Sequence, residues 1–294
     1  MTSLPVGATV ALATPLDENG ALDHTALAKL VARVVEGGVV GISPTGSTGE
    51  GPRLDRDTRV AVTRAVREQA PTGMPVVSGV PLTSVSEGLR ELDLLAENGA
   101  TAALVAPPYY YPLTDADAVG LYEHLADRSS IPLVLYNIPV FTKVRFAPDV
   151  VRRLAAHPNV TGIKDSSRDT EYFQQVVAAT EGADFAVLTG SDTMLVASLL
   201  SGGHGTIAAS ANLVPELSAG ICRDIAAGEL DQALAAQRRL QDVIHACRGG
   251  TPPAAWKAAL HHAGVCEPYL APPATGLGDG EYRTLMETLE SLGV

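Results

Sequence analysis

The residue with the clearest chemical potential in this chain is Lys164, which lies near the end of the short apolar segment Val160–Asp165 (VTGIKD). An apolar approach removes water from the amine, and desolvation favours the neutral amine over the ammonium form. A neutral amine attacks carbonyl carbons and forms Schiff bases. Lys164 is therefore a candidate for covalent catalysis on a carbonyl substrate, although a lysine at the end of a strand is more often simply solvated.

A second candidate is the loop Gly46–Glu50 (GSTGE), in which two glycines flank Ser47 and Thr48. Glycine permits backbone conformations that turn successive N–H groups toward one point, and such a nest binds an anion such as a carboxylate. An ordinary turn between a strand and a helix is the alternative.

Tyrosines supply a third kind of candidate. Tyr109–Tyr111 form a run between prolines, and aromatic residues of this kind also pack at half-buried edges. Tyr136 ends a separate apolar segment, and we expect its strand to neighbour the strand of Lys164. Tyr136 is therefore the stronger candidate for a role in chemistry.

The elements that would position these residues alternate regularly along the chain to about residue 228. The predicted strands are Ala8–Ala13, Val39–Ser43, Pro75–Gly79, Ala102–Ala106, Leu133–Tyr136, Val160–Lys164, Phe185–Thr189 and Gly205–Ala208. The predicted helices between them are His24–Glu36, Arg56–Gln69, Ser84–Glu97, Ala116–Asp127, Pro148–His157, Thr170–Thr180, Thr193–Ser201 and Pro215–Ala227.

Eight strand–helix units predict parallel strands closed into a (β/α)8 TIM barrel. An open doubly wound sheet is the alternative, but the segment Ala13–Asp17 is no glycine-rich dinucleotide loop. We assign residues 1–228 to the barrel and residues 229–294 to a C-terminal helical extension packed on it. The helices predicted for this extension are Leu230–Ala246, Pro253–Ala263 and Glu281–Leu292.

Active sites of such barrels lie at the carboxyl ends of the strands. The loop Gly46–Glu50 follows the second predicted strand, Tyr136 ends the fifth and Lys164 ends the sixth. Gly190 follows the seventh strand, and Ile207 lies in the eighth. The fold would therefore gather these candidates at one end of the barrel.

Several motifs together resemble a known family. They are Gly46–Glu50, Tyr136–Pro139, Gly162–Asp165, Gly190–Asp192, Gly203–Ile207 and Ala211–Asn212. In this order they are similar to the signatures of the dihydrodipicolinate synthase / N-acetylneuraminate lyase family, which are class I, pyruvate-handling aldolases. The resemblance covers nearly the whole chain.

The resemblance implies a mechanism in which Lys164 attacks the keto carbon of pyruvate, or of a related 2-keto acid, and forms an iminium ion. Tyr136 would shuttle protons, with the hydroxyls of Ser47 and Tyr110 as relay partners. In this family Tyr110 would reach in from a neighbouring subunit, which implies a homo-oligomer, either a homotetramer or a homodimer.

The resemblance also implies the substrate contacts. The N–H groups of Ser47 and Thr48 would hold the substrate carboxylate, and Gly190 and Ile207 would line the pyruvate pocket. The implied partners are a small 2-keto acid and an aldehyde, and no cofactor is implied.

One position departs from the family pattern. The synthases of this family usually carry an arginine two residues after Pro139, where it binds the carboxylate of aspartate semialdehyde, and this chain has Phe141. A phenyl ring cannot make that bidentate contact. Lys143 and Arg145 follow on what we expect to be an extended segment. We therefore predict a metal-independent, Schiff-base-forming carbon–carbon (or carbon–oxygen) lyase, which acts on a 2-keto-3-deoxy sugar acid or a related 2-keto acid. Synthesis from pyruvate and aspartate semialdehyde is the alternative.

Two rival classes remain. A metal-dependent aldolase needs clustered ligands, but His261 and His262 are adjacent in a predicted helix and so face different ways, and we expect no metal site. A non-catalytic barrel that binds keto acids is the other rival. Against it stands the intact set of candidate side chains.

Composition excludes further classes. A net charge of −12 and a pI of about 5.0 argue against binding to nucleic acid or an anionic membrane. No cation precedes Lys29, as a secretory signal would require, and no apolar run reaches the ~18 residues of a membrane span. The three cysteines are odd in number and far apart, which favours reduced thiols in a cytoplasmic protein.

Overall fold

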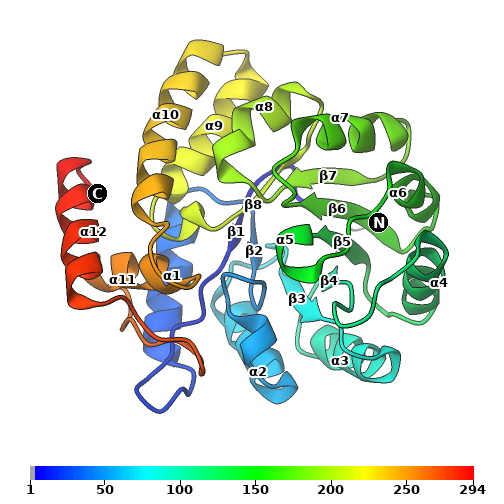
Figure 1. Cartoon of the computed structure of the whole chain (residues 1–294), viewed down its shortest axis with the longest axis horizontal. Helices are drawn as coiled ribbons and strands as arrows, with labels where there is room; N and C mark the ends of the chain where they lie inside the picture. The colour runs from blue at the N-terminus through cyan, green and yellow to red at the C-terminus, as the bar shows by residue number, and fades with distance from the viewer. Residues whose placement is uncertain (1–3) are drawn as a thin grey trace.

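A computed structural model describes residues 4–294, and in it eight parallel strands surround one axis (Figure 1). The strands are β1 (Gly7–Ala11), β2 (Gly41–Ser43), β3 (Val77–Pro81), β4 (Ala102–Ala106), β5 (Leu133–Asn137), β6 (Val160–Asp165), β7 (Ala186–Thr189) and β8 (Gly205–Ala208). Their order in the sheet is β2-β1-β8-β7-β6-β5-β4-β3.

The two outer strands of this order, β2 and β3, meet at a parallel bridge between Ile42 and Val76. The Ile42 N–H group also donates to the Pro75 carbonyl at 2.9 Å. The sheet is thereby nearly closed on itself. The predicted TIM barrel is confirmed, and an open doubly wound sheet is excluded.

Helices alternate with the strands as predicted. They are α1 (His24–Glu36), α2 (Arg56–Gln69), α3 (Val85–Glu97), α4 (Asp115–Ala126), α5 (Pro139–Thr142), α6 (Pro148–Ala155), α7 (Thr170–Ala179), α8 (Leu195–Leu200), α9 (Pro215–Ala227), α10 (Leu230–Ala246), α11 (Ala254–His262) and α12 (Asp279–Ser291). The short helix α5 was not predicted. Among residues 4–294, no helix combines the length and the apolar character needed to cross a membrane.

Helix α1 illustrates how the sequence sets these elements. The Asp23 side chain caps its start by accepting the N–H groups of Thr25 and Ala26. Leu27, Leu30, Val31 and Val34 are buried at helical spacing on one face. That face packs into the hydrophobic layer between helices and strands.

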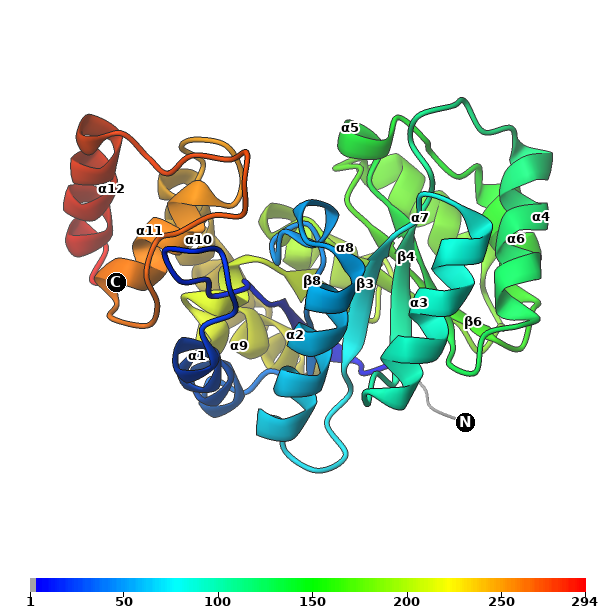
Figure 2. The same cartoon turned by 90° about the horizontal axis from the view of Figure 1, so that it is seen from below.

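The C-terminal helices α10–α12 lie together on one side of the barrel, opposite α4 and α6 (Figure 2). Leu240, Leu260 and Leu285 from these helices belong to the same hydrophobic cluster as Leu27 of α1. A C-terminal helical extension packed on the barrel is therefore present. The boundary placed at residue 228 stays a prediction, because this hydrophobic cluster is continuous across it.

Candidate active site

The structure brings Lys164 and Tyr136 together at the carboxyl end of the barrel. Strands β5 and β6 pair in a register that sets Tyr136 beside Lys164. The ammonium nitrogen lies 4.5 Å from the centroid of the tyrosine ring, and each residue is only 4% exposed. The amine is therefore shielded from water, and the face of the tyrosine ring lies against it.

The hydroxyl of Ser47 joins this pair, with its oxygen 3.3 Å from the Tyr136 hydroxyl. Ser47 belongs to the loop Gly46–Glu50, which closes on itself through a hydrogen bond from the Gly51 N–H to the Gly46 carbonyl at 3.0 Å. Within residues 4–294, the N–H groups of Ser47 and Thr48 donate to no protein acceptor. Two free donors on a tight loop can receive an anion.

Gly190 directly follows β7, the neighbour of β6, and Ile207 lies in β8, the next strand in the sheet. A side chain at Gly190 would place its Cβ atom 2.7 Å from the Lys164 Cε atom and against the Ser166 hydroxyl, so glycine is the residue that leaves room for this lysine. Ile207 is 1% exposed and belongs to the same inner hydrophobic cluster as Tyr136. Gly190 therefore lies beside the candidate nucleophile, and Ile207 belongs to the inner apolar layer that also contains Tyr136.

Tyr110 and Phe141 are exposed, unlike the buried pair Lys164 and Tyr136. Tyr110 is 81% exposed, and its ring packs edge-on against Tyr111 with centroids 5.0 Å apart. Phe141 is 54% exposed on α5. Both residues lie on the exposed rim of the barrel end.

The segment after Phe141 differs from the extended chain expected. Residues 139–142 form helix α5, and Lys143 ends it in a left-handed conformation with φ of +60°. The Lys143 ammonium group donates to the Val140 carbonyl at 2.8 Å, and the Arg145 guanidinium donates to Asp169 at 2.6 Å. Both cations are thus engaged in other contacts.

Asp165 and Asn137 are site residues whose role the sequence did not indicate. The Asn137 amide donates to the Asp165 carboxylate at 2.7 Å, across the same strand pair that aligns Tyr136 with Lys164. Burial raises the pKa of Asp165, while hydrogen bonds from Asn137 and Ser167 oppose this shift. This contact fixes the strand ends that carry the two candidate catalytic residues.

Asp192 is a second residue that the sequence did not single out beyond its motif. One of its carboxylate oxygens accepts the Ser210 N–H at 3.0 Å, and the other has no hydrogen-bond partner in the described chain. Burial raises the pKa of Asp192, and the positive charge of Lys164 opposes this shift. One buried oxygen of this carboxylate is therefore an acceptor without a donor in the described chain.

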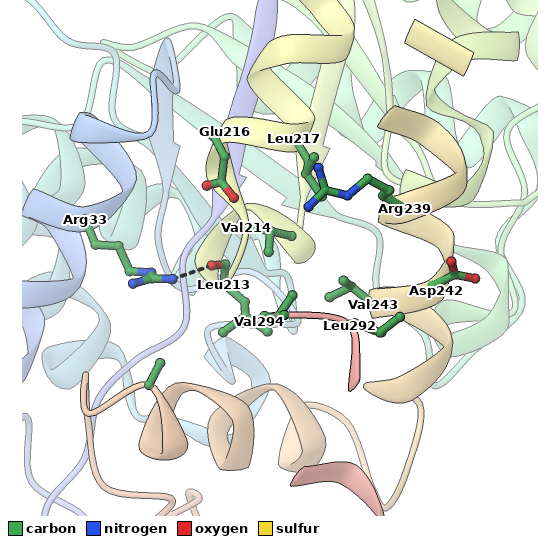
Figure 3. A pocket seen from close by; sticks show the side chains of 12 residues that line it. Arg33, Leu213, Val214, Glu216, Leu217, Arg239, Asp242, Val243, Leu292 and Val294 are labelled. Carbon is green, nitrogen blue, oxygen red and sulfur yellow. Dashed lines mark hydrogen bonds between the residues drawn. The ribbon is translucent and has the colours of Figure 1, made fainter. Parts of the chain in front are cut away.

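A separate hollow lies between α1, α9, α10 and the last residues of the chain (Figure 3). Arg33 borders it and donates to the Leu213 carbonyl at 2.6 Å. None of the predicted site residues lines it. Within residues 4–294, no three His, Cys, Asp or Glu side chains are grouped so that they could hold a metal ion.

Known proteins are similar to this chain over nearly its whole length. The family model described as the dihydrodipicolinate synthetase family matches residues 5–292. The 4-hydroxy-tetrahydrodipicolinate synthase of Nitrosospira multiformis is 36% identical over 293 residues, which are 98% of this chain and 96% of that protein. The protein of the same name from Pseudomonas aeruginosa is 33% identical over 288 residues, 98% of each chain.

Solved structures agree with this. Dihydrodipicolinate synthase from Bacteroides thetaiotaomicron superposes with a TM-score of 0.93 at 31% identity, covering 99% of this chain and 100% of that one. YagE, a prophage protein of the dihydrodipicolinic acid synthase family from E. coli K12 in complex with pyruvate, superposes with a TM-score of 0.95 at 28% identity, covering 99% of both chains. The likeness therefore includes every strand end that carries a candidate site residue.

Proposed function

The chain belongs to the dihydrodipicolinate synthetase family of Schiff-base aldolases, and we propose that it joins pyruvate to aspartate semialdehyde as a 4-hydroxy-tetrahydrodipicolinate synthase. The observation that carries the chemistry is the buried contact between Lys164 and Tyr136, with Ser47 beside the phenol. The names of the relatives favour the synthase over the sugar-acid lyase that Phe141 suggested.

Lys164 acts as the nucleophile in this proposal. Its amine adds to the keto carbon of pyruvate, and loss of water gives a protonated imine. The iminium ion withdraws electrons, so a proton leaves the pyruvate methyl carbon and an enamine forms. The enamine carbon then bonds to the aldehyde carbon, whose oxygen takes up a proton. The amino group of aspartate semialdehyde then adds to the imine carbon and displaces the lysine amine, which closes the ring and returns the free lysine. The iminium ion is the electron sink, so the proposed reaction requires neither a metal ion nor another cofactor.

Tyr136 moves protons in these steps. Its hydroxyl contacts Ser47 at 3.3 Å, so a proton can pass between the two hydroxyls while the ring stays against Lys164. The free N–H groups of Ser47 and Thr48 hold the pyruvate carboxylate. Gly190 and Ile207 complete the pocket beside the lysine and the tyrosine.

We further propose that the enzyme is a homo-oligomer, with a homodimer as its smallest active unit and a homotetramer as a larger form. Tyr110 is 81% exposed and flanked by two more exposed tyrosines, and within residues 4–294 its hydroxyl makes no hydrogen bond to Tyr136 or Ser47. An exposed aromatic cluster on the rim is suited to contact a second copy of the chain. In that arrangement Tyr110 enters the neighbouring site.

Trapping with borohydride tests the proposed imine. Reduction in the presence of pyruvate should fix a pyruvate adduct on Lys164, detected by mass spectrometry of peptides. The variant Lys164→Met should lose the adduct, whereas Lys143→Met, which changes an exposed lysine, should keep it. An unmodified Lys164 in the wild-type protein would reject the mechanism and favour a non-catalytic barrel.

A panel of aldehydes tests the second substrate. Offered with pyruvate, aspartate semialdehyde should be consumed faster than glyceraldehyde if the protein is a synthase. The sugar-acid lyase remains the second candidate because Phe141 offers no charge to the carboxylate of aspartate semialdehyde. Preferential use of glyceraldehyde, or cleavage of a 2-keto-3-deoxy sugar acid, would replace the synthase by that lyase.

A further inference from the structure

A buried ion pair joins the C-terminal extension to the loop that carries Ser47 and Thr48. The Glu50 carboxylate, at the end of this loop, lies 2.7 Å from the ammonium nitrogen of Lys257 on α11, and both side chains are 0% exposed. Burial lowers the pKa of Lys257, and the Glu50 carboxylate opposes this shift. Each charge is therefore stabilised by the other, because neither side chain is exposed to water.

Further contacts hold Glu50 from the same side of the molecule. Its second carboxylate oxygen accepts the N–H of Ala271 at 2.9 Å and lies 3.3 Å from the guanidinium of Arg53. Arg53 also donates to the Pro252 carbonyl at 3.0 Å. Lys257 donates to the carbonyl of Tyr269. Glu50 is thus linked directly to Ala271 and, through Arg53, to Pro252, while the contact with Tyr269 holds Lys257 within the C-terminal extension.

The backbone of the loop explains why such a hold is needed. Thr45 and Glu50 have φ angles of +56° and +58°, in the left-handed region that residues with a Cβ atom seldom adopt. A residue in such a conformation costs on the order of 1–3 kcal/mol of stability, and it is found where several surrounding contacts hold it in place. The contacts of the Glu50 side chain can hold Glu50 itself in this left-handed conformation.

A buried ion pair is by itself weak evidence for stability, since a well-packed apolar pair is often as stable. The Glu50–Lys257 pair does, however, determine geometry, because it fixes a loop residue only two positions from Thr48. We propose that Glu50 and Lys257 are positioning residues, through which the C-terminal extension holds the Ser47 and Thr48 N–H groups in the orientation that receives the pyruvate carboxylate. This inference rests on the proposed function of that loop.

The substitution Lys257→Met tests it, because methionine fills the volume without charge. The pyruvate concentration that gives half-maximal trapping by borohydride should rise about tenfold or more, as expected for displaced binding groups. The amount trapped at saturating pyruvate should stay near that of the wild type, because Lys164 and Tyr136 are untouched. A loss of trapping at saturation with an unchanged midpoint would overturn the positioning role.

The double variant Glu50→Gln with Lys257→Met guards against a failure of the single variant to fold. It leaves no unpaired buried charge, and a glutamine oxygen can still accept the Ala271 N–H. If the two residues are coupled, the double variant should be half-maximally trapped at a lower pyruvate concentration than the more impaired of the two single variants, Glu50→Gln and Lys257→Met. Midpoint changes that simply multiply would show that the two residues act independently and would reject the proposal.

Hydrogen exchange of the full-length variants separates this inference from the proposed function. In Lys257→Met, exchange should speed up at residues 46–51 and 269–271, whatever ligand the loop binds. Tyr122→Phe is the matched control, because it removes a buried hydrogen bond to the Val105 carbonyl at 2.8 Å on the opposite side of the barrel. Unchanged exchange at residues 46–51 would overturn the inference. Absence of any trapped adduct in the wild type would reject only the proposed function.

Discussion

The ring of Tyr136 lies 4.5 Å from the Lys164 ammonium nitrogen, and the register of β5 and β6 sets the two residues side by side. The hydroxyl at the other end of the same ring reaches Ser47 at 3.3 Å. One tyrosine therefore contacts the candidate nucleophile with its face and a second hydroxyl with its tip. This arrangement separates two tasks, shielding of the amine and movement of protons.

The substitution Tyr136→Phe separates these tasks experimentally. The ring remains, so Lys164 keeps its dry environment and should still be trapped by borohydride with pyruvate. Loss of the hydroxyl should lower kcat by about 10²–10⁴-fold, the usual contribution of general acid–base catalysis. The matched control Tyr122→Phe should lose about 1 kcal/mol of stability and keep its kcat. Equal turnover in Tyr136→Phe would remove this residue from the mechanism.

Gly190→Ala tests the space around the nucleophile. The new methyl group would lie 2.7 Å from the Lys164 Cε atom, closer than real Cβ contacts, so the lysine must shift. A displacement of about 1 Å should slow imine formation by about 10²-fold, measured by the rate of trapping. Gly120→Ala is the control, since no atom lies within 4 Å of its new methyl group on α4. Normal trapping in Gly190→Ala would show that the pocket tolerates the shift.

Much of this arrangement was predictable from the sequence because it depends on local patterns. Helix α1 spans His24–Glu36, the same residues that the sequence pattern predicts. Tyr136 and Lys164 lie at the ends of two consecutive strands. Because consecutive strands are neighbours in a parallel barrel, the predicted fold places the two residues side by side. Local periodicity and strand order together were sufficient for this part of the site.

The remaining features depend on contacts between distant segments. Helix α5 has only four residues, too few for a helical period, so the sequence did not predict the helix that carries Phe141. The pairing of Glu50 with Lys257 depends on how the extension packs, although a lysine within an otherwise apolar helix was a usable signal. The proposed role of Tyr110 depends on a second chain, which the fold of one subunit does not reveal.

Mixing of variants tests the role of Tyr110. Tyr110→Phe should lower kcat, whereas Tyr109→Phe and Tyr111→Phe, which change its exposed neighbours, should not. A mixture of inactive Lys164→Met and Tyr110→Phe subunits should regain activity after exchange, because hybrid dimers contain one complete site. Size-exclusion chromatography with light scattering would verify the dimers. If the activity of the mixture after subunit exchange equals the sum of the two variants' separate activities, Tyr110 takes no part in the relay.

The pH dependence of stability tests the buried Asp165. Its pKa is raised above the ordinary value of 3.8, chiefly by burial. Between the unfolded and folded pKa values, the folded protein holds a proton that the unfolded chain has lost, so stability falls as pH rises through this window. The free energy of unfolding of the wild type minus that of Asp165→Asn should therefore be largest in acid and decline toward neutral pH. Denaturation with urea across this range measures it, and a difference that grows with pH would contradict the assignment.

The last prediction concerns the second substrate. Phe141 is 54% exposed on α5, where an arginine side chain has room to reach a carboxylate. Phe141→Arg should lower the KM for aspartate semialdehyde by about 10-fold or more, since a charge-assisted hydrogen bond contributes about 1.5–3 kcal/mol. Val140→Arg, which adds the same charge one residue away, controls for general electrostatic attraction. An equal effect of both variants, or no effect of either, would show that the aldehyde carboxylate binds elsewhere. In that case Phe141 would not set the choice of aldehyde.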